Sequence, residues 1–142
     1  MGKSMAVRVR RNVQSLIDEG DAGLAVLADY AHAIEKMKRL DPGTGELSDP
    51  PPTDPRSWRF QAAIHGYPDL EGSIDHPRRW GSCRHGSWFF LAWHRMYLLF
   101  FEQIVQFHLS DPSWSLPYWD YTKVDDEAAR ILPEPFPEAD DR

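Results

Sequence analysis

The stretch from Trp88 to Leu109 constrains the fold most, because it contains neither glycine nor proline. Those two residues interrupt helices, so their absence predicts one long helix. Its apolar side chains lie around most of the helical circumference, which is typical of a helix buried within a bundle. The most apolar part, residues 88–101, contains His94 and Arg95 and is shorter than the ~20 residues that a membrane span needs. We therefore expect a helical protein without a membrane span.

Two further helices are expected before this one. From Asp21 onward, apolar residues recur at steps of three and four, with acidic residues early and basic residues late, as the helix dipole favours. The apolar positions are Leu24, Leu27, Ala28, Ala31, Ile34 and Met37. Over residues 57–65, Trp58, Ala62 and His65 fall on one face of a second, shorter helix. The pattern predicts a mainly α fold, a helical bundle with long loops.

Loops are expected between and after these helices. Residues 41–56 form a proline-rich loop, and residues 132–142 form an extended tail with several prolines and acids. Residues 6–15 alternate apolar and basic side chains at first, which predicts a short edge strand or an extended lead-in. Residues 116–121 are aromatic and fixed by a proline, so they are suited to packing over a core. At this length, residues 1–142 are expected to form a single unit.

Charge and cysteine content exclude several classes of protein. The chain has 22 acidic and 16 basic residues, a formal net charge of -6, so no nucleic-acid partner is expected. Its one cysteine, Cys83, excludes an internal disulfide. The first residues lack the apolar stretch of ~7–15 residues that an export signal carries. We therefore expect a cytoplasmic protein, or one exported together with a partner.

The histidines are the first candidates for chemistry. Six are present, namely His32, His65, His76, His85, His94 and His108. Imidazole is the commonest side-chain ligand for metals, and a buried site needs at least three such groups at one point. His94 and His108 lie on the same face of one helix, but a rise of ~1.5 Å per residue separates them by roughly 21 Å. None of the histidines forms a His-x-x-x-His pair, and we assign structural roles to His32, His76 and His108.

The other three histidines can converge. His85 and His94 would lie on opposite faces of a continuous helix, so His85 must precede the helix. A turn at Gly86 would let His85 fold back toward His94. His65, at the end of the shorter helix, supplies a third corner. Taken one at a time, each of the three is more readily explained as a purely structural histidine.

The sequence around these histidines decides between a structural role and a role as metal ligands. Residues 83–102 contain a histidine, an aromatic stretch, a Trp-His-Arg and an apolar run ending in Phe-Glu. This segment closely resembles the first copper-binding signature of the tyrosinase family. Residues 64–66, Ile-His-Gly, resemble the part of the family that carries its first ligand, and residues 116–121 resemble its Pro-Tyr-Trp-Asp segment. The resemblance spans most of residues 58–137.

The resemblance implies a role for individual residues. It implies half of a helical, binuclear (type 3) copper domain in which His65, His85 and His94 hold the first copper. Phe90, one helical turn before His94, is expected to pack near the copper. In some members of the family a cysteine at this place forms a thioether to an imidazole carbon, which here would join Cys83 to His85. A buried free cysteine is the ordinary alternative.

The second copper site of the family has no counterpart in this chain. In the family it is held by a His-x-x-x-His helix and a later histidine, C-terminal to the Pro-Tyr-Trp-Asp segment. The chain is therefore expected to be the front half of a longer arrangement. A second polypeptide or a C-terminal fragment would supply the second copper, or two copies would pair about a two-fold axis. In a third arrangement the chain is a one-metal protein, a copper- or dioxygen-binding module or a zinc hydrolase.

The activity that the resemblance implies is copper-dependent oxidation. Its substrates would be phenols, catechols or aminophenols together with dioxygen, by a tyrosinase-like monooxygenase or a catechol oxidase. The rival class is a non-catalytic dioxygen carrier, since haemocyanins resemble tyrosinases in the metal site. The family also allows a small companion protein that loads the copper.

Overall fold

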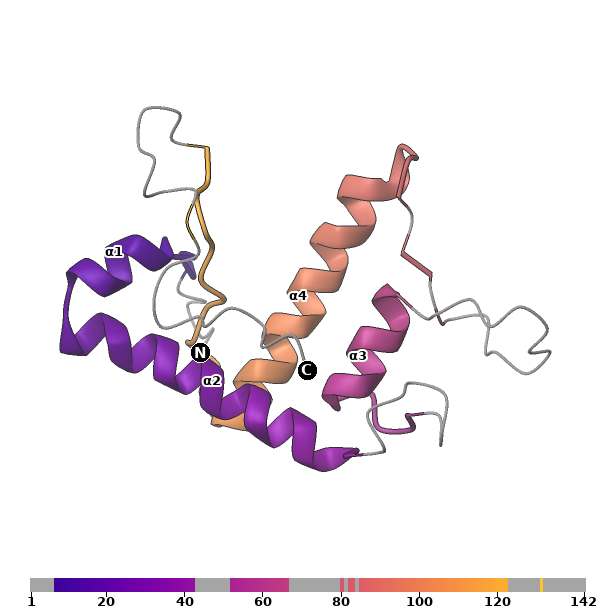
Figure 1. Cartoon of the computed structure of the whole chain (residues 1–142), viewed down its shortest axis with the longest axis horizontal. Helices are drawn as coiled ribbons and strands as arrows, with labels where there is room; N and C mark the ends of the chain where they lie inside the picture. Colours follow the sequence, from indigo (N-terminus) through magenta and orange to yellow (C-terminus); the bar gives the residue numbers. More distant parts are fainter. Residues whose placement is uncertain are drawn as a thin grey trace, which may run out of the picture. The chain divides into compact units, whose positions relative to one another are not determined.

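The computed structural model describes residues 7–42, 52–66, 80, 82–83, 85–122 and 131. These residues form four helices, which are α1 (Val13–Asp18), α2 (Asp21–Leu40), α3 (Trp58–His65) and α4 (Phe89–Leu109) (Figure 1). The only pairing of extended backbone in the described ranges is one parallel bridge between Asn12 and Tyr118. The prediction of a mainly α fold is confirmed.

The chain divides into two compact units. One unit comprises residues 1–29 and 113–142, and the other comprises residues 30–112. That residues 1–142 act as a single unit stays a prediction. The described parts of the proline-rich loop, residues 41–42 and 52–56, are not helical. The rest of that loop and the tail at 132–142 lie outside the described residues.

The first unit contains a helix that the sequence analysis missed. Residues 6–15 were expected to be extended, but α1 begins at Val13. The side chain of Asn12 caps this helix by accepting a hydrogen bond of 2.7 Å from the backbone N–H of Gln14. Val13 and Leu16, three residues apart, then become buried together with Leu27 of α2. The cap and the two buried side chains therefore stabilise a short helix, although the sequence pattern predicted extended backbone.

The second unit brings α3 and α4 together with the later part of α2. The Tyr97 hydroxyl of α4 donates a hydrogen bond of 3.1 Å to the carbonyl of Gln61 in α3. The Lys36 ammonium of α2 donates one of 2.8 Å to the carbonyl of His108 near the end of α4. These two bonds connect α4 to α3 and to the later part of α2.

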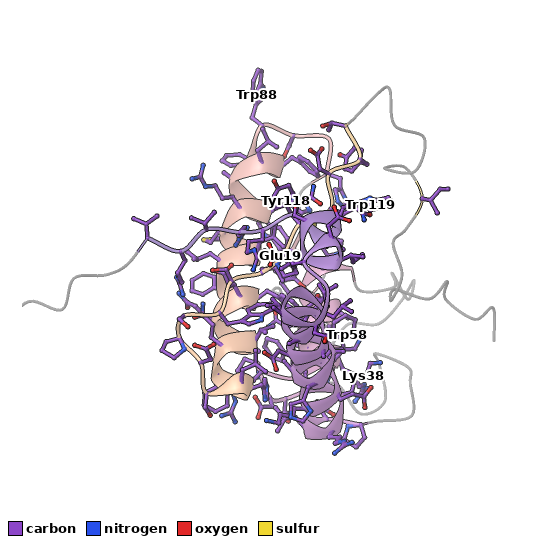
Figure 2. The ribbon with its side chains drawn as sticks, turned by 90° about the vertical axis from the view of Figure 1, so that its left-hand side faces the viewer. Glu19, Lys38, Trp58, Trp88, Tyr118 and Trp119 are labelled. Carbon is purple, nitrogen blue, oxygen red and sulfur yellow. The ribbon has the colours of Figure 1, made fainter. Side chains whose placement is uncertain are left out.

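Helix α4 differs from expectation in its burial. It was expected to be buried on most sides, yet Trp88, just before it, points away from the helix in Figure 2. Trp88 is 100% exposed and Leu91 is 76% exposed. The buried residues lie in its second half, namely Phe101, Glu102, Val105, Gln106 and His108. Within its unit α4 packs against α3 and α2 on one side, which leaves its other apolar positions on the surface. None of the described helices is both long and apolar enough to cross a membrane.

Candidate metal centre

Four side chains meet beside the start of α4. His65, Cys83, His85 and His94 each offer one ligand atom, and these atoms lie within 4.8 Å of one another. We call this group the histidine–cysteine cluster. Its ring centroids form a nearly equilateral triangle, with separations of 5.8 Å, 5.6 Å and 5.3 Å. The structure thus brings together the three histidines that the sequence singled out.

Local backbone structure places each histidine. Helix α3 ends at His65, where the backbone N–H of Gly66 bonds to the carbonyl of Ala62 at 2.8 Å. His85 lies before α4. The next residue, Gly86, has a φ of +68°, in the left-handed region that favours glycine. The sequence analysis expected a turn here. The turn lets His85 lie over the beginning of α4, so His85 does not extend the helix.

His94 is oriented by the backbone of its own helix. Its Nδ1 lies 2.8 Å from the carbonyl oxygen of Phe90, so the Nδ1 proton is donated there. The Nε2 atom is left facing the cluster, and a backbone partner of this kind fixes the tautomer of a metal-binding histidine. The Phe90 ring lies 4.3 Å from the His94 ring and 5.6 Å from the His85 ring, and its packing near copper stays a prediction.

Two aromatic residues beside His65 were not singled out from the sequence. The rings of Trp93 and Tyr97 lie 6.1 Å and 5.8 Å from the His65 ring, and they stack on each other at 5.1 Å. Their spacing of four residues was the available signal, because it puts both on one face of α4. Together they form an apolar wall on one side of the cluster.

Electrostatics favour the neutral form of His65. Burial lowers the pKa of His65, and the neighbouring His94 and His85 lower it further. The neutral imidazole is the form that binds metals. Burial also raises the pKa of Tyr97 to about 12, so its phenol stays protonated and keeps donating to Gln61.

Cys83 is a free cysteine at the edge of the three rings. Its Sγ lies 3.1 Å from Nε2 of His94 and 3.4 Å from Nε2 of His85. Burial raises the pKa of this thiol. The thioether between Cys83 and His85 stays a prediction.

The remaining histidines lie elsewhere. His32 is exposed on α2, and His108 is buried with its Nε2 3.3 Å from the carbonyl of Arg56. Neither belongs to the histidine–cysteine cluster. His76 lies outside the described residues.

Comparison with known proteins places the chain in a family. Residues 55–141 match the common central domain of tyrosinase. The chain belongs to the tyrosinase family. The matched segment contains every member of the histidine–cysteine cluster. Tyrosinases use copper, and imidazoles suit that metal, so the three histidines fit the cofactor of the family.

Individual relatives show how much of a tyrosinase is present. Tyrosinase HcTyr1 of Hahella sp. is 34% identical over 83% of this chain, and a chloroplastic polyphenol oxidase of Malus domestica is 36% identical over 73% of it. A tyrosinase structure from Burkholderia thailandensis matches 82% of the chain with 31% identity and a TM-score of 0.58. The chain spans 26%, 16% and 21% of the lengths of these three proteins.

Proposed function

We propose that this chain is part of a copper-dependent oxidase of phenols, catechols or aminophenols, and that His65, His85 and His94 hold one copper ion. The convergence of these three imidazoles carries the proposal. His65 is the last residue of α3, His85 lies before α4, and His94 lies inside α4. Three imidazoles whose ligand atoms lie this close together provide the number of groups that a metal site of this kind needs.

The chain's own residues have separate tasks in this proposal. Bound copper would supply the redox chemistry with dioxygen. The imidazoles bind in their neutral form, and the Phe90 carbonyl holds the His94 ring so that Nε2 faces the metal. The rings of Phe90 and Trp93 lie 4.3 Å and 5.0 Å from the His94 ring and help to hold that ring in place.

The second copper is proposed to come from another polypeptide or from a C-terminal fragment. Among the residues that the structure describes, the histidine–cysteine cluster is the one group of this kind, and a binuclear site needs a second. Beside it, α3 and α4 form an apolar groove of about 530 Å³. Its lining includes Phe60, Ile64, Trp93, Tyr97, Phe100 and Ile104. An apolar surface of this kind is suited to a partner segment.

Native mass spectrometry of the copper-loaded protein tests this arrangement. Two coppers with a second, different chain would support the proposal. Two identical chains with two coppers would replace it with a symmetric dimer, in which both ligand sets come from this sequence. A lone chain that keeps one metal and takes no partner would contradict the split arrangement.

Turnover separates an oxidase from a carrier. The assembled protein should oxidise a simple catechol in air, with quinone formation followed by absorbance. The matched control is the assembly built with His94→Ala, which lacks one ligand and should lose turnover. Reversible dioxygen binding without quinone formation would contradict the oxidase proposal and favour the carrier.

A further inference from the structure

The sulfur of Cys83 lies on the metal-binding side of the imidazoles. Its contacts at 3.1 Å and 3.4 Å are to the Nε2 atoms of His94 and His85. In His94 the opposite nitrogen is already engaged by the Phe90 carbonyl, so Nε2 is the atom available to a metal. A sulfur beside that atom therefore stands where a fourth ligand would stand.

The distances agree with a tetrahedral site. With metal–nitrogen bonds of about 2.0–2.1 Å and a metal–sulfur bond of about 2.3 Å, tetrahedral angles put nitrogen and sulfur roughly 3.5 Å apart. The observed sulfur–nitrogen distances, 3.4 Å to His85 and 3.1 Å to His94, are slightly below this tetrahedral distance. All four ligand atoms fall within 4.8 Å of one another, so the side chains farthest apart must approach by about 1 Å to complete the tetrahedron.

We propose that Cys83 is a fourth metal ligand, and that with His65, His85 and His94 it holds one Zn²⁺ or Cu⁺ ion in a closed, four-coordinate site. The proposal rests on the function proposed above only in taking the three histidines as ligands. Thiolate and imidazole together suit these d¹⁰ ions, which favour tetrahedral coordination. On binding, the thiol loses its proton to solvent and no electron is transferred.

A closed site has a consequence for the oxidase. Catalytic metal sites keep a coordination position open for water or substrate, whereas sites with four protein ligands are structural. With sulfur bound, the chain would hold its metal securely but leave no position for dioxygen. Withdrawal of Cys83 would open the site, so this residue would separate a storage form from an active form.

Spectra of the Co²⁺-loaded chain test the proposal directly. Co²⁺ replaces Zn²⁺ in tetrahedral sites, and a cobalt–thiolate bond gives an intense sulfur-to-metal band in the near ultraviolet. The wild-type chain should show this band, and Cys83→Ser should lose it while still binding one Co²⁺ through the histidines. Losing a partner that merely orients a ligand weakens metal affinity by about 10–100-fold, so Zn²⁺ affinity should fall at least that much in the variant.

The neighbouring serine provides a matched control. Ser82→Ala changes a small side chain one position away and should keep the cobalt–thiolate band. A second measurement needs no variant. Zn²⁺ should protect Cys83 of the wild-type chain from alkylation by iodoacetamide, and a chelator should restore its reactivity.

Different failures point to different errors. An unchanged spectrum and Zn²⁺ affinity in Cys83→Ser would overturn the role of sulfur and leave the histidine site intact. An intact mass two hydrogens below the sequence value would show the thioether to His85, which excludes a thiolate ligand. A wild-type chain that binds neither Co²⁺ nor Zn²⁺ would overturn the sulfur ligand and the histidine site together.

Discussion

At the scale of single residues, two histidines on one helix show how surroundings decide a role. His94 and His108 both lie on α4, and each has a ring nitrogen near a backbone carbonyl. The second nitrogen of His94 faces two more imidazoles and a sulfur, whereas His108 is packed near the end of the helix beside Arg56. A ligand is therefore defined by what the free nitrogen meets.

Replacing these histidines separates the two roles. His94→Ala should lower the metal affinity of the chain by at least about 10–100-fold, because it removes one of the four proposed ligands from the cluster. His108→Ala should retain binding at a comparable affinity. Equilibrium dialysis with Zn²⁺ measures both, and an equal loss in the two variants would contradict the ligand set.

Ionisation of Tyr97 should lower the free energy of unfolding at alkaline pH. Its pKa is raised from 10.0 to about 12 in the folded chain, chiefly by burial. Between these two values the unfolded chain loses the proton first, so ionisation favours unfolding and stability falls as pH rises above 10. The free energy of unfolding of Tyr97→Phe, measured with urea, should fall less steeply than that of wild type between pH 10 and pH 12. Parallel curves for the two proteins would contradict this assignment.

At the scale of elements, α1 and α2 meet at a close backbone contact. A Cβ atom added at Gly23 would lie 1.8 Å from the carbonyl oxygen of Leu16. Alanine normally stabilises a helix relative to glycine by roughly 1 kcal/mol. Here the sign should reverse, because overpacking against backbone costs about 1–3 kcal/mol.

Urea unfolding of Gly23→Ala measures this reversal. Gly66→Ala is the control, since an added Cβ there meets no atom within 4 Å. The control should change the free energy of unfolding little. A Gly23→Ala variant as stable as wild type would mean that the two helices do not approach so closely.

A buried ion pair ties α3 to the residue that follows α2. Arg59 Nη1 lies 2.9 Å from Asp41 Oδ1, with the two side chains 7% and 15% exposed. Asp41→Asn removes a charged partner of the buried Arg59 guanidinium, which should cost more than about 1 kcal/mol and up to about 3–5 kcal/mol in thermal or urea unfolding.

The exposed pair of Glu35 and Lys38 is the comparison. Their charged atoms lie 3.9 Å apart and both side chains are more than half exposed. Glu35→Gln should therefore cost less than about 1 kcal/mol. Similar losses in Asp41→Asn and Glu35→Gln would show that the Arg59 pair is not buried in solution.

At the scale of the whole molecule, the histidine–cysteine cluster links segments that are distant along the chain. It joins the end of α3, the residues at 83–85 and the first turns of α4, all within one of the two units. An ion that binds these ligands only in the folded chain must stabilise that unit.

Metal binding should therefore raise the melting temperature. At a free Zn²⁺ concentration of 100 times Kd, the expected gain is about 2.7 kcal/mol. Thermal unfolding with and without a chelator measures it, and hydrogen exchange should show the added protection in α3 and in the first turns of α4. Equal protection across both units would contradict a metal confined to residues 30–112.

Much of this protein follows from its sequence alone. Helical periodicity and the positions of glycine and proline predicted α2, α3 and α4 nearly to their ends, because these signals act over a few neighbouring residues. The family motif and the spacing of the histidines also singled out His65, His85 and His94 and excluded a site shared by His94 and His108. Helix α1 was missed, because its stability depends on one cap and on burial against Leu27.

Only the tertiary structure decided what surrounds the three histidines. The contacts of Trp93 and Tyr97 with His65, the position of the Cys83 sulfur and the exposure of α4 all depend on how segments far apart in sequence pack together. The periodicity of a sequence indicates which faces of a helix are apolar, but it does not indicate which segments cover those faces. Ligand residues can be predicted one at a time, whereas a site is a set of distances that packing alone determines.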